Sequence, residues 1–354
     1  MELLFYLLIS LAAILLSCLI FTNSIEWFGV KLNLSHGITG SVLAAVGTAL
    51  PETVVPLVAI FWGVNLESFK NILRGDMGAL NAMDQISIGA IIGAPFMLCT
   101  IAFFLIGLSS LVYFKAGVRK SINISVDKSF LQRDLRFFIL SFLLAFMGIF
   151  LDRTFRIVLA FVLIALYVIY IYRTFKMEKD ADVKIKQMEE GLDPLLLTRV
   201  FPFLKPTLFF ISVQLVLSLL CLIYSAHHFV DVIKEISHHL NFPAFVISLL
   251  LTPIATELPE KFNSWIWISQ RKDILAVGNI SGALVFQSTF PVSVGLLFTS
   301  WHVDSPLSYL LFLICVINSV IILFALKKDK LTYKTFLLCG VLYLVYLVLL
   351  FSKM

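Results

Sequence analysis

Charged residues are scarce in this sequence. They make up 14% of its 354 residues, whereas average globular domains carry about a quarter. Hydrophobic residues account for 60%, and the mean hydropathy is +0.99. Apolar runs of roughly 20 residues, the length that spans a bilayer, recur along the whole chain. The shortage of charge therefore excludes a soluble globular protein and predicts an all-α polytopic membrane protein whose main partner is the lipid bilayer.

The sequence also lacks the common catalytic motifs. It has no H-E-x-x-H, no Gly-rich P-loop with Lys and no G-x-S-x-G. We therefore expect neither an enzyme nor a resident cofactor, and a transporter driven by ATP would need a nucleotide domain that is missing. The five cysteines are odd in number and all lie in apolar runs, so no disulfide framework is expected.

The apolar windows predict about ten transmembrane spans. They cover residues 2–22, 37–63, 86–114, 135–151, 156–175, 206–226, 242–269, 274–299, 306–326 and 333–352. The longest polar gap, 176–205, separates an N-terminal repeat (1–175) from a C-terminal repeat (206–354), each with five spans. This gap is mixed in charge and is predicted to be a linker.

The distribution of Lys and Arg predicts the orientation in the membrane. Most of the 27 basic residues lie in the odd-numbered loops, which include the central linker. Because cytoplasmic loops are enriched in Lys and Arg, we expect the linker to be cytoplasmic and both termini to lie outside. The expected location is the plasma or inner membrane. The net charge of +5 then reflects membrane-flanking loops, and no nucleic-acid partner is expected.

Two spans carry the same anomaly, a Leu-Pro-Glu sequence within an apolar run. Aligning TALPE (48–52) with TELPE (256–260) places each motif in the second span of its own half. Each half has an odd number of spans, so the two motifs run through the membrane in opposite senses. This pattern predicts an inverted repeat in which broken helices two and seven meet near the midplane and form an ion site.

The two motifs offer several oxygen ligands within one helical turn. A proline leaves the carbonyl four residues earlier without its donor, so Pro51 frees the carbonyl of Gly47 and Pro259 that of Ala255. Hard cations such as Ca²⁺ bind six to eight oxygens, carboxylates included. A glutamate in mid-span is costly and is a functional residue by default. The candidate cation-binding residues of the two motifs are Gly47, Thr48, Glu52, Ala255, Thr256 and Glu260.

These motifs resemble a known family. GTALPE (47–52) and ATELPE (255–260), together with GNISGALVFQ (278–287), resemble the two α-repeats of the sodium/calcium exchanger (cation/calcium antiporter) superfamily. The repeats of that family read G-T-S-x-P-E and then G-N-x-x-G-S-N-x-x-N/D on the next span. The resemblance implies that Glu52 and Glu260 are the principal Ca²⁺ ligands, or metal ligands, with Thr48 and Thr256 beside them.

The sequence departs from the family pattern at several ligand positions. Ala49 and Glu257 stand at the serine of the two motifs, Ala283 replaces a later serine, and Leu98 and Gln287 stand at the final Asn/Asp. By position, the resemblance adds Glu257 and Gln287 to the candidate cation-binding residues. The set has lost neutral oxygens and gained an acid, so two intact Na⁺ sites of the usual kind are not expected. Three carboxylates around one divalent ion cannot all stay ionised once it leaves. We therefore hypothesise that Glu257, with Glu52 and Glu260, takes up protons when the cation departs.

The predicted function is secondary active antiport, with Ca²⁺ or another divalent cation exported in exchange for Na⁺ or H⁺ by a monomer. The alternatives are an H⁺-coupled antiporter for a different cation, a passive cation channel, and a transport-inactive scaffold of the same fold.

Two further features stay open at the level of sequence. Lys261, next to Glu260, either extends towards the membrane surface or neutralises a carboxylate. The outer segment 227–239 places one histidine pair at each end, at His227 and His238, and it either binds a metal or is a plain amphipathic helix.

Overall fold

The fold was analysed in a computed structural model that describes residues 2–31, 45–61, 81–178, 194–201, 203, 205–240, 243–303 and 306–352. Every regular element in these ranges is a helix. Seven helical stretches are long and apolar enough to cross a membrane: Leu3–Phe21, Asp84–Lys115, Arg153–Thr174, Leu208–His239, Asp273–Phe298, Pro306–Lys327 and Tyr333–Ser352. They confirm the all-helical, multi-pass class.

The other three predicted spans coincide with shorter or more polar helices. Span 37–63 contains α3 (Ala45–Phe61), and span 242–269 contains α12 (Ala244–Thr256) and α13 (Leu258–Ser269). Span 135–151 falls on α7 (Lys128–Met147) and the 3₁₀ turn η3 (Gly148–Phe150). The carboxylate of Asp127 caps α7 by accepting from the N–H groups of Ser129 and Phe130, so this helix begins before its apolar run.

The described helices fall into two compact units that differ from the two sequence halves. Unit 1 comprises Met1–Ala90 and Val168–Pro259, and unit 2 comprises Ile91–Tyr167 and Glu260–Met354. Each unit therefore combines spans from both halves. The boundary Pro259/Glu260 falls within the TELPE motif, so Glu257 belongs to unit 1 and Glu260 to unit 2.

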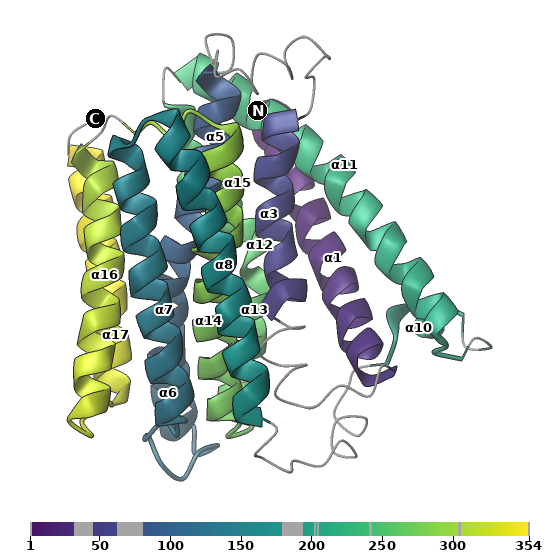
Figure 1. Ribbon diagram of the computed structural model, residues 1–354. Helices are drawn as coiled ribbons and strands as arrows, with labels where there is room; N and C mark the ends of the chain where they lie inside the picture. Colours follow the sequence, from purple (N-terminus) through teal and green to yellow (C-terminus); the bar gives the residue numbers. More distant parts are fainter. Residues whose placement is uncertain are drawn as a thin grey trace. The chain divides into compact units, whose positions relative to one another are not determined.

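Unit 1 is built on two long helices, α1 (Glu2–Lys31) and α11 (Leu208–Leu240), which pack against each other (Figure 1). Both helices also contact α3 and α12. A continuous apolar cluster joins these four helices; its members include Ile14, Val55, Phe229 and Ile247. At one end, the amide of Gln214 donates to Asn23 and Ser24, tying α11 to α1. The same amide accepts from the N–H of Leu197 and so holds the short helix α10 (Leu196–Val200).

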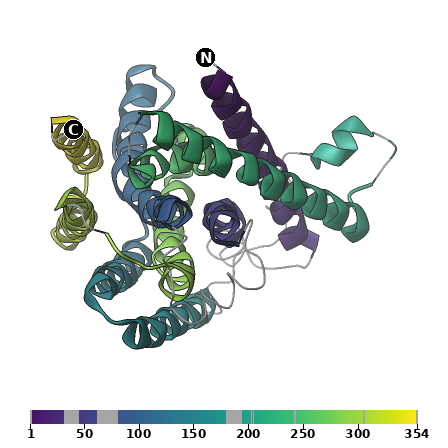
Figure 2. The ribbon, with the colours of Figure 1, turned by 90° about the horizontal axis from the view of Figure 1, so that it is seen from above.

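Unit 2 is a bundle of helices. They are α5 (Asn81–Met97, from Ile91), the π-helix η2 (Leu98–Ala102), α6 (Phe103–Lys115), α7, η3, α8 (Arg153–Glu178, to Tyr167), α13 (from Glu260), α14 (Asp273–Gln287), α15 (Phe290–Phe298), α16 (Pro306–Lys327) and α17 (Tyr333–Ser352). Contacts join α17 to α6, α16 to α7 and α17, and α14 to α7. Figure 2 shows α16 and α17 as neighbours, seen nearly along their axes.

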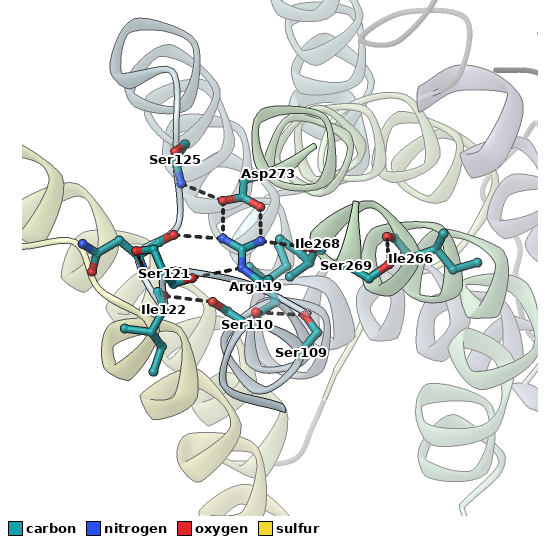
Figure 3. Close-up of polar contacts among 12 residues, drawn as sticks. Ser109, Ser110, Arg119, Ser121, Ile122, Ser125, Ile266, Ile268, Ser269 and Asp273 are labelled. Carbon is teal, nitrogen blue, oxygen red and sulfur yellow. Dashed lines mark hydrogen bonds and ion pairs between the residues drawn. The ribbon is translucent and has the colours of Figure 1, made fainter. Parts of the chain in front are cut away.

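Three loops of unit 2 lie on the same side of the bundle. The guanidinium of Arg119, in the α6–α7 loop, binds Asp273 at the start of α14, with Nη1 to Oδ1 at 2.6 Å (Figure 3). Lys128, at the start of α7, forms an ion pair with Asp329 in the α16–α17 loop. The charge distribution in the sequence predicts all three loops to be cytoplasmic, and the two ion pairs are consistent with their common side.

Replacing Gly89 by Ala should destabilise the protein. Gly89 lies where α5 meets α12, and a Cβ there would stand 2.4 Å from the carbonyl oxygen of Phe245. Because that atom belongs to the backbone, the helices must separate, which typically costs about 1–3 kcal/mol. A lower midpoint of thermal unfolding in detergent, followed by tryptophan fluorescence, is expected.

Gly278 provides the matched control for this substitution. It occupies the same motif position in the other repeat, and a Cβ built on it meets nothing within 4 Å. Gly278→Ala should leave the midpoint unchanged or raise it, since Ala favours helix over Gly by about 1 kcal/mol. Equal loss in both variants would show that close packing at Gly89 is not the cause.

Candidate cation site

Glu52 is a buried carboxylate in the middle of α3. Only 2% of its surface is exposed, and Thr53 beside it is buried as well. α3 packs against α1, α11 and α12, and its residues Val54, Val55 and Val58 belong to the core of unit 1. Placing an acidic group at such a position costs at least about 2.5–3.5 kcal/mol in a membrane helix. The burial therefore supports a functional role for this residue.

The predicted break in span two is not observed in the described part of α3. The helix continues from Ala45 to Phe61 through both Pro51 and Pro56. Gly47 and Thr48 lie on this helix, and the side chain of Thr48 is outside the described residues. A proline removes one N–H donor, and the remaining backbone bonds keep this segment helical.

Span seven is interrupted at Glu257. α12 ends at Thr256 and α13 begins at Leu258, while Glu257 between them has φ −95° and ψ 1°. The N–H of Glu257 still donates to the carbonyl of Pro253, at 3.2 Å. Pro259 is the second residue of α13, a position where a helix needs no N–H donor. The proline therefore lets a second helix start directly after the first one ends.

The interruption places a second acidic group inside unit 1. The side chain of Glu257 is fully buried, and it ends a helix that packs against α3, which carries Glu52. The neighbouring Thr256 is also buried, and its hydroxyl donates to the carbonyl of Thr252 at 3.1 Å. The hydroxyl oxygen of Thr256 keeps lone pairs that can still coordinate a cation. Unit 1 thus contains two buried carboxylates, of Glu52 and Glu257, and the buried hydroxyl of Thr256.

Glu260 and Lys261 begin the part of α13 that belongs to unit 2. The side chains of Glu260 and of Ala255 lie outside the described residues. Lys261 is only 6% exposed, and its Nζ lies 2.7 Å from the sulfur of Met97. The burial argues against a lysine that extends towards the membrane surface. Neutralisation of a carboxylate by Lys261 stays a prediction.

Two amide side chains of α14 lack polar partners among the described residues. Asn279 is 5% exposed and Gln287 is fully buried, and neither the nitrogen nor the oxygen of either amide has a hydrogen-bond partner there. Buried polar groups of native proteins are nearly always hydrogen-bonded, so an exception calls for a water, an ion or a functional role. Gln287 is a predicted ligand, and the structure adds Asn279 as a second candidate.

The two spans that follow the Leu-Pro-Glu motifs leave α-helical geometry at corresponding positions. If Gly89 is aligned with Gly278, Leu98 corresponds to Gln287. The π-helix η2 begins at Leu98, and α14 ends at Gln287 before a turn. The carbonyl of Cys99 in η2 accepts from the amide of Asn318 at 3.1 Å. π-Bulges occur frequently at functional sites, and this pairing supports the repeat inferred from the motifs.

Asp134 is a buried acid that the sequence did not single out. It lies in α7, and its carboxylate accepts from the hydroxyl of Ser281 at 2.6 Å and from the guanidinium of Arg133 at 2.8 Å. Ser281 belongs to the GNISGALVFQ stretch, so Asp134 positions α14 from the side. In the sequence it lies between two basic residues, Arg133 and Arg136, at the edge of an apolar window, which is typical of a loop. Only the early start of α7 brings it inside.

The outer histidine pairs do not form a common metal site. α11 is continuous from Leu208 to Leu240, which separates His227 from His238 by about 16 Å along the axis at 1.5 Å per residue. His227 lies 3.4 Å from Asp231 one turn later. Within the described ranges, no group of three or more His, Cys, Asp or Glu side chains could hold a metal ion.

Ser264, one turn after Glu260 on α13, bridges two helices. Its hydroxyl donates to the carbonyl of Ala276 in α14, at 3.4 Å. For Ser264, helix–helix bonding is therefore the observed role.

One family model matches both halves of the sequence. The family model described as "Sodium/calcium exchanger protein" matches residues 2–176 and 210–352. No curated protein matches the sequence at a significant level.

The fold is similar to two groups of solved structures. One is the H⁺/Ca²⁺ exchanger CAX, at 18% identity and a TM-score of 0.71, with 99% of this chain and 82% of that one covered. Another is the sodium-calcium exchanger NCX_Mj, at 22% identity and a TM-score of 0.59, with 98% of each chain covered. A sodium/calcium exchanger from Methanococcus jannaschii matches at 21% identity and a TM-score of 0.55, over 97% of this chain and 96% of that one. At these identities the likeness concerns the fold.

Proposed function

Because this chain belongs to the sodium/calcium exchanger protein family, we propose that it is a secondary antiporter that exchanges Ca²⁺ or another divalent cation for H⁺, wholly or partly. The observation that carries the proposal is the burial of two carboxylates, Glu52 and Glu257, on packed helices of unit 1. Acidic groups inside membrane helices mark ion pathways. Two of the similar solved structures are described as H⁺/Ca²⁺ and sodium-calcium exchangers.

The proposed ligands are oxygen atoms from both repeats. Glu52 and Glu260 supply the principal charges and Glu257 a third, while the other proposed ligands are the carbonyls of Gly47 and Ala255, the hydroxyls of Thr48 and Thr256, and the amide of Gln287. A Ca²⁺ ion in a protein takes six to eight such oxygens. The ten-span plan with inverted repeats 1–175 and 206–354 is part of this proposal, with a helix break in span seven.

H⁺ is proposed as the coupling ion because the site is rich in carboxylates. When the cation leaves, like charges in a low-dielectric site repel each other, and protonation of one or more of them relieves this repulsion. Glu257 supplies the added acid, and its full burial means that water cannot screen its charge. Protons entering from the opposite side then replace the divalent cation during alternating access.

The decisive experiment is Ca²⁺ flux into proteoliposomes with one driving gradient at a time. We expect Ca²⁺ uptake when the vesicle interior is more acidic than the outside, so that protons leave as Ca²⁺ enters. Little uptake is expected without any gradient. Uptake that needs Na⁺ and never responds to pH would overturn the H⁺ coupling while leaving antiport intact. Ca²⁺ current without a counter-gradient would indicate a channel, and the absence of all flux a scaffold.

Replacing Glu257 by Ser should weaken H⁺ coupling selectively. The change removes the third carboxylate and restores the residue type of the family pattern. We expect uptake driven by the pH gradient to fall about tenfold or more, because less repulsion is left for protons to relieve. Ca²⁺/Ca²⁺ equilibrium exchange, which needs no proton, should stay within about threefold of the unchanged protein. Equal loss of both activities would contradict a role in coupling.

The proposed placement in the cell follows the same charge distribution. The protein is proposed to work as a monomer in the plasma or inner membrane, with the linker 176–205 in the cytoplasm and both termini outside. The position of the basic loops of unit 2 on one side supports this orientation.

A further inference from the structure

A groove lies between α16 and α17 at the end where their connecting loop turns. Its volume is about 530 Å³, within the range of about 300–1,000 Å³ typical of ligand pockets. Both helices belong to unit 2. The residues that matter for its chemistry are Val320, Phe324, Leu338, Lys328, Lys330 and Lys334.

The walls of the groove are apolar and open to the surroundings of the bundle. Val320, Phe324 and Leu338 are between 42% and 57% exposed. On a membrane helix such side chains face the acyl chains of lipids. The groove therefore offers a long apolar surface that a small soluble ligand would leave uncovered.

One end of the groove carries concentrated positive charge. Lys328, Lys330 and Lys334 line it and are exposed. The nearby carboxylate of Asp329 forms an ion pair with Lys128 of α7, so another basic residue already compensates its charge. The three lysines are thus available for an external anion.

The loop that presents the lysines has a defined conformation. Asp329 has φ 55°, and the N–H groups of Asp329 and Lys330 donate to Leu326 and Ala325 at 3.2 and 2.9 Å. This pattern is a Schellman cap, which closes the end of a helix with a left-handed residue. The ammonium of Lys328 lies 4.1 Å from the ring centroid of Phe324. The backbone of the loop is therefore defined, and the ammonium of Lys328 lies at the end of the apolar wall.

We propose that this groove binds an anionic phospholipid. The phosphate is held by Lys328, Lys330 and Lys334, and an acyl chain lies along Val320, Phe324 and Leu338. A basic pocket between transmembrane helices at the cytoplasmic surface has the chemistry that recognises anionic headgroups. The charge favours an anion over a zwitterionic lipid, and the apolar wall favours a lipid over a free phosphate.

The test is a titration of the purified protein with single lipids, read by native mass spectrometry. Dioleoyl phosphatidylglycerol should bind at least about tenfold more tightly than dioleoyl phosphatidylcholine. The triple variant Lys328→Gln/Lys330→Gln/Lys334→Gln should lose this preference. The matched control, Lys115→Gln/Lys120→Gln/Lys272→Gln, removes three exposed lysines of other loops and should keep it. Thermal unfolding without lipid checks that both variants are folded.

Three outcomes would overturn the proposal. Equal binding of both lipids would show an apolar groove without headgroup recognition. Equal loss in the two triple variants would show general surface attraction. If glycerol 3-phosphate or inorganic phosphate at millimolar concentration displaced the phosphatidylglycerol, the groove would be a site for soluble phosphate. If the groove variant does not fold, Leu338→Ser is tested with the same lipids. It should weaken phosphatidylglycerol binding by about fivefold or more, and unchanged binding would contradict the proposal.

Discussion

Replacing Glu52 by Gln should reduce the initial rate of Ca²⁺ uptake into proteoliposomes about 100-fold. Gln has nearly the same shape, so the substitution removes a negative charge from a fully buried position on α3 and little else. Contacts that involve a charged group are worth about 1.5–3 kcal/mol, and about 1.4 kcal/mol changes a rate tenfold. The protein should still insert and fold, because a buried neutral amide is less costly than a buried charge.

Glu235→Gln is the matched control for this prediction. Glu235 lies on α11 of the same unit and is exposed, so the same chemical change there should leave the rate within about twofold. Glu260→Gln should act like Glu52→Gln if the two motifs are equivalent halves of one site. A near-normal rate in the Glu52 variant, with normal amounts of folded protein, would refute the assigned site.

The features that sequence reasoning predicts well are those that depend on one residue and its solvent. An apolar run of 20 residues crosses a bilayer whatever its neighbours are, and the seven long apolar helices follow from composition alone. The burial of Glu52 follows in the same way, from a carboxylate with no nearby polar segment. The division of these elements into two units that each combine parts of both sequence halves is a result of packing and has no local signal.

The Leu-Pro-Glu motifs do not by themselves predict whether the helix is interrupted. The three residues of the first motif lie inside the continuous helix α3, whereas those of the second motif begin α13 directly after the interruption at Glu257. A proline removes a donor in both cases, so the proline alone does not determine a break. The two motifs differ in the residue before Leu, which is Ala49 in one and Glu257 in the other.

Contacts between distant residues were not predictable either. The distribution of basic residues predicts a cytoplasmic loop around Arg119. Nothing local indicates that Arg119 is buried or that its partner is Asp273. Asp134 is a similar case, because its partner Ser281 lies on another helix. Such pairs become visible only when the helices are assembled.

Breaking the pair between Arg119 and Asp273 should cost about 3–5 kcal/mol of folding stability, the usual cost of leaving one buried charge alone. Both side chains are at most 4% exposed. All five N–H groups of Arg119 have acceptors: the carboxylate of Asp273 and the carbonyls of Ser121, Asn123 and Ile268. Asp273 also accepts from the N–H of Ser125. Arg119→Met or Asp273→Asn should therefore strongly lower the midpoint of thermal unfolding in detergent.

The double variant separates the pair from its surroundings. Removing both charges leaves no lone ion, so Arg119→Met/Asp273→Asn should be more stable than the sum of the two single losses predicts. Lys128→Met and Asp329→Asn form the matched control, because this pair also joins two loops but is 63% and 70% exposed. Exposed pairs contribute about 0–1 kcal/mol, and so each control variant should change little. If the buried and the exposed pair were equally tolerant, Arg119 would not fasten the α6–α7 loop to the start of α14, and another contact would have to hold the helix that carries Gln287.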